Sequence, residues 1–343
     1  MWEVENQTPF AVDGVFVRDC EAREVWVVAI RATFRFDSRN RLIRPREQQP
    51  PIMAPQHLGK PGQSSLRYDT DFVLRRPATD VIAHGIAHAP GGVPARSIDV
   101  GMRVAGRTKG LRVHGPRVWE RRLSSVVPGP AASFTQMPIT YEVGYGGWDP
   151  EGSRAKPPLC FAKNPVGRGF ARVVEGLVGQ PACSVEPMDQ PAKAGILDGT
   201  VAGFGPIDRS WQPRASDAGT YDQAWQDNRA PLFPLDYNER FCRQAPADQR
   251  LDRVLQPGEL IETLNLVPFG RLAVAVPRIE FRVLALFSDR EMAAVPTLDT
   301  VIIESEGALV RFVWRAAIEC HGREDKLQRS LVQWSGERAW QNE

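Results

Sequence analysis

The sequence predicts a mainly β protein: an antiparallel, β-sandwich-like scaffold with long loops rich in glycine and proline and a few short helices. Three observations predict this fold class. Runs of β-branched and aromatic residues, some alternating with polar residues, occur toward both ends of the chain, as strands of a half-buried sheet do. Several runs are short and closely spaced between turn residues, which is typical of antiparallel pairing. The 29 glycines and 29 prolines together make up about 17% of the 343 residues. The usual combined share is about 12%, so this composition indicates extensive loops.

The strand-like runs flank a region of different composition, and this sets the expected domain organisation. We expect a single large β domain over residues 1–343, in which residues 145–250 form a loop-rich central region with two short helices. An alternative is a pair of β subdomains, 1–145 and 251–343, bridged by that region. The chain shows no repeat at a fixed period, which excludes solenoids and propellers.

The N-terminal runs begin the scaffold. Residues 25–36 are rich in valine and aromatic residues and predict a strand. Residues 10–17 predict a partner strand, which the polar stretch 19–24 closes into a hairpin. Five prolines within residues 45–62 predict a loop, because proline cannot sustain regular structure there.

Two further groups of runs predict the remaining strands. Glycine breakers separate the runs 80–88, 97–104, 111–113 and 117–120, which together predict an antiparallel meander. In the C-terminal third we expect strands at 271–276, 279–287, 300–304 and 308–317, the last two joined by a tight turn at 305–307. Arg311 and Arg315 alternate with apolar residues, so one face of that strand is expected to be buried and the other to face solvent.

Two capping patterns predict the short helices of the central region. Thr220 with Gln223 forms a capping box that predicts a helix over 221–228. Asp236 with Glu239 forms a second one, with Asp236 as the N-cap of a helix over 237–244. Prolines soon after each segment are consistent with a helix end.

Charge and hydropathy exclude several classes of protein. The chain holds 43 Lys and Arg against 41 Asp and Glu, so bulk charge does not favour nucleic acid. It has no apolar run near the roughly 20 residues of a membrane span. The N-terminal residues lack the pattern of a secretory signal, which predicts a cytoplasmic protein. Five scattered cysteines fit free thiols better than a disulfide framework.

The motifs for common chemistries are missing, so we expect no catalytic site, no cofactor and no metal. His84 and His88 have helical metal spacing, but on a strand they lie about 13 Å apart. The sequence contains no P-loop, dinucleotide-binding fingerprint or nucleophile elbow. A carbohydrate-active hydrolase that uses Asp222 with Asp217 or Asp236 is the enzymatic alternative. The helix-terminal positions of Asp222 and Asp236 favour structural roles instead.

Two stretches have the composition of interaction surfaces. Residues 103–122 carry seven basic residues against Glu120 alone, which favours a solvated sheet face and leaves open a docking face for an acidic partner. Residues 203–249 form a platform shaped by glycine and proline that carries Trp, Tyr and Arg, the residue types enriched at binding hot spots. We expect the partner-binding residues there to be Trp211, Arg214, Tyr221, Asp222, Trp225 and Arg229.

Several motifs, in order, resemble those of a bacterial family long catalogued as a domain of unknown function, whose members act as adaptors or chaperones for type VI secretion effectors. The resemblance covers most of the chain, to about Arg315. It rests on the sequences that begin at Asn6, Arg76, Gly115 and Asn164, on Phe134 with Met137 and Pro138, on Tyr141 with Gly146 and Gly147, and on the platform. Two positions depart from the family's pattern, which usually has lysine at Arg76 and an acidic residue at Pro116.

The resemblance implies a cytoplasmic protein that binds a secreted effector and assists its loading onto the secretion spike. The partners expected on this basis are the effector and a spike or spike-tip protein, with no nucleic acid and no membrane span. The first alternative is the carbohydrate-active hydrolase described above. A purely structural module is the other alternative, and it needs no partner encoded beside it.

Overall fold

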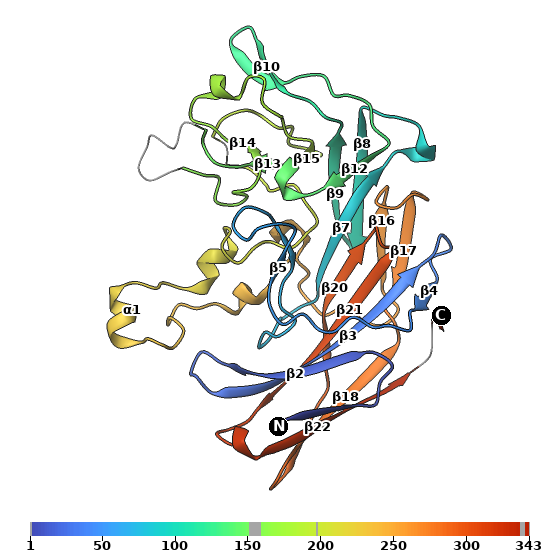
Figure 1. The fold of residues 1–343 in the computed structure, drawn as a ribbon, viewed down its shortest axis with the longest axis vertical. Helices are drawn as coiled ribbons and strands as arrows, with labels where there is room; N and C mark the ends of the chain where they lie inside the picture. The colour runs from blue at the N-terminus through green and yellow to red at the C-terminus, as the bar shows by residue number, and fades with distance from the viewer. Residues whose placement is uncertain (1, 151–158, 197, 337–339, 343) are drawn as a thin grey trace.

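The computed structural model describes residues 2–150, 159–196, 198–336 and 340–342 (Figure 1). Their regular secondary structure is mainly strand, with a few short helices, which confirms the predicted fold class. The part of the expected loop region that covers 151–158 and 197 lies outside the described residues. Within the described ranges the chain has one α-helix, α1 (Gln223–Asn228).

An eight-stranded sheet forms the centre of the fold. Its main path runs β12-β7-β20-β21-β3-β4-β23, and β2 pairs with β3 at one side. These strands are β2 (Ala11–Arg18), β3 (Glu24–Phe36), β4 (Leu42–Arg44), β7 (Asp80–His88), β12 (Gln136–Ile139), β20 (Thr297–Glu304), β21 (Leu309–Glu319) and β23 (Gln341–Asn342). The hairpin of β2 with β3 and that of β20 with β21 are confirmed.

Two smaller sheets share a hydrophobic core with the eight-stranded sheet. The four-stranded sheet has the order β1-β22-β18-β19 and the five-stranded sheet the order β15-β9-β8-β16-β17. Their strands are β1 (Glu3–Asn6), β22 (Leu327–Gly336), β18 (Ile279–Phe287), β19 (Glu291–Ala294), β15 (Val185–Pro187), β9 (Arg107–His114), β8 (Ser97–Val104), β16 (Leu260–Leu264) and β17 (Arg271–Ala275). Strands from the two ends of the sequence therefore hydrogen-bond within the same sheets.

The predicted meander is only partly correct. β8 and β9 pair as antiparallel neighbours, but β7 pairs with β12 and, in parallel, with β20, whose sequence lies more than 200 residues away. β10 (Trp119–Arg122) pairs with β11 (Ser125–Pro128) in a separate hairpin. The expected loop at 45–62 contains the two-residue strand β5 (Gln56–His57), which pairs with β6 (Leu66–Tyr68). Sequence proximity alone thus misassigned the partner of β7.

The two faces of the eight-stranded sheet have opposite chemistry. Phe312 and Trp314 of β21 point into the shared hydrophobic core, as predicted. The other face was expected to meet solvent, and that expectation is wrong, because Arg311 and Arg315 are only 2% and 4% exposed. Their acidic partners, Glu304 and Asp299, come from the neighbouring strand β20, and the loop before β7 supplies Asp71 to Arg31. Figure 1 shows the loop before β7 and the central region beside the sheet.

The central region folds into two parts. Its first part surrounds a separate small core around Trp119 and includes the short parallel strands β13 (Tyr145–Gly146) and β14 (Arg168–Gly169). Gly146 has a φ of +149°, and a Cβ there would lie 2.1 Å from the Asn164 carbonyl oxygen, so only glycine fits. The second part carries α1, which projects from the body in Figure 1.

Both predicted helix caps need correction. The N-cap of α1 is Asp222, not Thr220, because the Asp222 carboxylate accepts a hydrogen bond from the backbone N–H of Trp225. The second predicted helix is a single 3₁₀ turn over Glu239–Cys242, and its N-cap is Asn238. Thr220 and Asp236 instead bind one another: the Asp236 carboxylate accepts from the Thr220 backbone N–H and hydroxyl.

Candidate functional site

Opposite charges fill the interface between the eight-stranded sheet and the segments that cover its polar face. We call this set the buried charge layer. In it, Arg31 lies 2.6 Å from Asp71, Arg311 lies 2.7 Å from Glu304, and Arg315 pairs with Asp299. Its members are Arg31, Arg76, Arg214, Arg243, Arg311 and Arg315 with Asp69, Asp71, Asp80, Asp299 and Glu304. Such pairs are tolerated in an interior because each charge has a partner.

Arg214 belongs to this layer, which corrects its expected role at a partner surface. Its guanidinium is fully buried, pairs with Asp69, and donates to the carbonyls of Ile207 (2.7 Å) and Phe241 (2.8 Å). Burial alone would raise the pKa of Asp69, but the guanidinium groups of Arg214, Arg209 and Arg76 lower it to about 2. Arg214 therefore attaches the central region to the segment before β7.

Trp211 is likewise in the interior rather than on a partner surface. It is 3% exposed and packs edge-to-face against Tyr141, with ring centroids 5.4 Å apart. The other four predicted partner-binding residues, Tyr221, Asp222, Trp225 and Arg229, lie together in residues 219–237, which we call the arm. Their role in partner binding stays a prediction.

The arm is held at its base and exposed along its length. The contact of Thr220 with Asp236 joins its two ends. Arg229 donates to the Cys20 carbonyl at 2.9 Å and lies 3.1 Å from Glu21, in the turn between β2 and β3. Tyr221 remains 53% exposed and Leu235 87% exposed. Large apolar groups on a tethered projection are available to a partner at a reduced cost in conformational entropy.

Within the arm, Trp225 has a structural role that Tyr221 lacks. Its indole N–H donates to the Leu232 carbonyl at 2.8 Å, and its half-buried ring meets that of Tyr221 with centroids 4.7 Å apart. Trp225 thus connects α1 to the returning segment of the arm at Leu232. Tyr221 packs on it and presents its other face to solvent.

The Asp222 cap predicts a measurable local effect. Asp222→Ala should lower the local free energy of opening of α1 by about 0.5–2 kcal/mol, because the Trp225 N–H loses its acceptor. Hydrogen exchange of the α1 amides measures this. Asp222→Asn is the matched control, since its amide oxygen can still accept. An equal loss in both variants would contradict the cap hydrogen bond as the cause, and loss of a hydrolytic activity in Asp222→Asn at unchanged stability would favour the hydrolase.

Ion pairs neutralise the basic stretch 103–122. Each of its seven cations has a carboxylate within 4.0 Å, from Arg103 with Glu262 to Arg122 with Glu120. Lys109 is only 7% exposed and reaches Asp248 at 2.8 Å, so the stretch is not simply a solvated face. With its charges paired, it offers an acidic partner little unbalanced positive potential.

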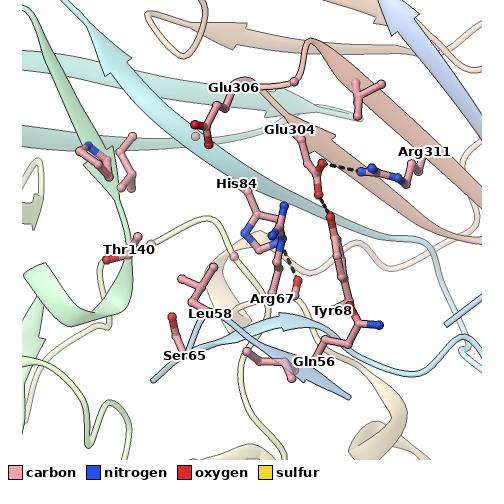
Figure 2. A pocket seen from close by; sticks show the side chains of 18 of the residues that line it. Gln56, Leu58, Ser65, Arg67, Tyr68, His84, Thr140, Glu304, Glu306 and Arg311 are labelled. Carbon is pink, nitrogen blue, oxygen red and sulfur yellow. Dashed lines mark hydrogen bonds and ion pairs between the residues drawn. The ribbon is translucent and has the colours of Figure 1, made fainter. Parts of the chain in front are cut away.

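A cavity of about 840 Å³ opens above the end of the buried charge layer (Figure 2). His84 of β7 and Glu304 of β20 stand side by side on neighbouring strands in its wall. The Tyr68 hydroxyl donates to Glu304, whose carboxylate also pairs with Arg311. Glu306 comes from the turn after β20, and Leu58, Thr140 and Arg67 are among the other lining residues labelled in the figure.

The polar groups of this cavity suit binding better than nucleophilic chemistry. The His84 Nε2–H donates to the Arg67 carbonyl at 2.7 Å, and burial is the main cause that lowers the pKa of His84 to about 4. Its imidazole is therefore neutral at physiological pH. The lining hydroxyl of Ser65 is buried and donates to Glu142 rather than to a histidine. The cavity thus offers fixed donors and acceptors beside apolar walls.

The lowered pKa of His84 predicts a pH dependence of stability. The unfolded chain binds a proton near pH 6.5 and the folded chain only near pH 4, so stability is complete above about 6.5 and falls as pH drops toward 4. The loss from this group is about 3 kcal/mol at most. Urea unfolding across that range should show a smaller loss in His84→Gln, which can still donate to Arg67. Identical pH profiles for both proteins would contradict this assignment.

The remaining chemical possibilities were searched among the described residues. No three His, Cys, Asp or Glu side chains in these ranges gather as metal ligands. No helix in the described part of the chain is long and apolar enough to span a membrane. Of the carboxylates considered for a hydrolase, Asp222 caps α1 and Asp236 binds Thr220.

The fold and these surfaces define a mainly β protein with a tethered arm and an open polar cavity. The chain belongs to the family described as an uncharacterized protein conserved in bacteria (DUF2169), whose model matches residues 21–315. No curated protein and no solved structure matches the chain. The family description states no activity, so the link to type VI secretion rests on the motif resemblance.

The residues that carry that resemblance build the scaffold. Arg76 donates to the Cys242 carbonyl at 2.7 Å, and Asp80 accepts from Arg243 and from the Gln244 backbone N–H. The Asn164 amide donates to the carbonyls of Tyr141 and Tyr145. These contacts hold the central region on the sheets, and the part of the platform that forms the arm projects beyond them.

Proposed function

We propose that the protein is an adaptor or chaperone that binds a type VI secretion effector and assists its loading onto the secretion spike. The observation that carries the proposal is the arm. It presents Tyr221 and Leu235 to solvent; the contact of Thr220 with Asp236 closes its base, and Arg229 ties it to Cys20 and Glu21. Preorganised aromatic and aliphatic groups are the usual anchors of protein interfaces.

The polar cavity holds groups that are partly engaged within the protein. Glu304 is paired with Arg311, and the neutral imidazole of His84 donates to the Arg67 carbonyl, while the carboxylate of Glu306 also lines the cavity. The expectation that the protein is not an enzyme stays a prediction. The hydrolase alternative stays one as well, and no specific feature of the described residues favours it.

Co-expression tests the proposed function. The protein should co-elute in size-exclusion chromatography with an effector or a spike-tip protein encoded beside it, and should raise the soluble yield of the effector. A purely structural module would do neither. Separate elution of every neighbouring secretion protein, with unchanged solubility, would contradict the adaptor proposal.

A further inference from the structure

A second cavity lies beside the four-stranded sheet, next to the connecting segments 254–257 and 276–277. It has a volume of about 800 Å³, and we call it the β19 groove. All three large sheets or their connections contribute to its mainly apolar lining, with Leu298 and Trp314 from the eight-stranded sheet, Phe281 and Trp334 from the four-stranded sheet, and Leu255 and Pro277 from connecting segments. The rings of Phe281 and Trp314 meet edge-to-face with centroids 5.0 Å apart.

An open strand edge borders this groove. β19 is the last strand of its sheet and pairs with β18 alone. Ala293 and Ala294 of β19 line the groove together with Val295, which is 76% exposed. Among the described residues, the backbone of Met292–Pro296 makes no hydrogen bond outside the ladder with β18. One side of β19 therefore has unused N–H and C=O groups next to an apolar surface.

Several other sheet edges of this protein carry features that discourage pairing. Proline interrupts two of them, at Pro138 in β12 and at Pro187 in β15. The edge of β17 is occupied where the Asn40 side chain accepts from the Ala273 backbone N–H at 3.1 Å. In contrast, β19 has small apolar residues and one charge, Glu291, at its start. The β19 edge therefore lacks the proline or side-chain cover seen at those edges.

We propose that β19 accepts an extended segment of a partner protein as an additional strand, whose alternate apolar side chains enter the β19 groove. The backbone selects a strand as the occupant, because a helix has no free main-chain groups to pair with an edge. The four residues of β19 span about 14 Å, so the added strand pairs over four or five residues. The small side chains of Ala293 and Ala294 leave room for it. This inference rests on the proposed function only in taking the effector as the natural partner.

Hydrogen exchange with mass spectrometry tests the inference in the complex. In the free protein the amides of β19 that do not pair with β18 should exchange quickly, and in the complex with the co-expressed effector they should exchange at least about tenfold more slowly. A complex that forms while β19 exchange stays unchanged would overturn the inference and leave the adaptor proposal intact.

A peptide arm makes the test independent of the effector. The probe is the acetylated and amidated pentapeptide Thr-Val-Thr-Val-Thr, and Thr-Pro-Thr-Pro-Thr is its control, because proline cannot pair with an edge. The first peptide should protect β19 and the second should not. If the first peptide does not slow β19 exchange, the inference is likewise overturned.

Two variants separate pairing at β19 from general apolar binding. Val295→Asp places a charge at the groove and should weaken binding of the first peptide at least tenfold, without loss of stability because Val295 is exposed. Val93→Asp is the matched control, since Val93 is 67% exposed elsewhere. Equal effects of the two variants would overturn the inference. Protection of β19 in the free protein that grows with its concentration would also overturn it, by identifying the occupant as a second copy of the chain.

Discussion

Arg214→Ala should destabilise the fold strongly rather than act on a binding surface. We expect the free energy of unfolding to fall by about 3–5 kcal/mol, because the variant leaves the buried carboxylate of Asp69 without its closest cation. The backbone carbonyls of Ile207 and Phe241 also lose the hydrogen bonds that the Arg214 guanidinium donates to them. Urea unfolding at pH 7 measures the loss.

The controls for this prediction isolate the ion pair. Arg240→Ala removes an exposed arginine from the same region and should change stability by less than about 0.5 kcal/mol. The double variant Asp69→Ala with Arg214→Ala should lose less than the two single losses added together, because neither charge is then left alone. Strict additivity, or a loss near that of Arg240→Ala, would contradict the pairing.

The strands could be predicted where local alternation determines the structure. The period-two pattern of β3 and β21 and the short turn between β20 and β21 are properties of contiguous residues, and the hairpins follow from them. The partner of β7 could not be predicted in this way. Its parallel neighbour β20 is far away in the sequence, so the pairing depends on packing of the whole sheet rather than on a local signal.

The site was harder to predict because exposure depends on distant partners. Trp211 and Arg214 are residue types that are common in binding surfaces. Arg214 is nevertheless buried, and it pairs there with Asp69, which lies 145 residues earlier in the sequence. A usable signal was present: Arg31 directly follows the apolar run 25–30, and Asp69 and Asp71 alternate next to Tyr68. Isolated charges of opposite sign within apolar runs indicate buried pairs, because an unpaired charge is too costly there.

Tyr221→Ala should weaken the complex with the effector and leave the fold unchanged. Tyr221 is 53% exposed, so its removal costs little packing in the free protein. If the arm is the contact surface, loss of a central aromatic anchor raises the dissociation constant roughly thirtyfold, about 2 kcal/mol. Titration calorimetry with the purified effector gives the affinity, and thermal unfolding gives the stability of the same samples.

Two variants define what this result means. Phe312→Ala removes a fully buried core ring and should cost about 3–5 kcal/mol of stability while the folded fraction keeps its affinity. Trp225→Ala should affect both quantities, because its indole binds Leu232 and supports the ring of Tyr221. The decisive comparison is Tyr221→Ala against Phe312→Ala. Should Tyr221→Ala bind as tightly as the unmodified protein, the arm is not the contact surface, and the β19 groove becomes the surface on which the effector must be sought.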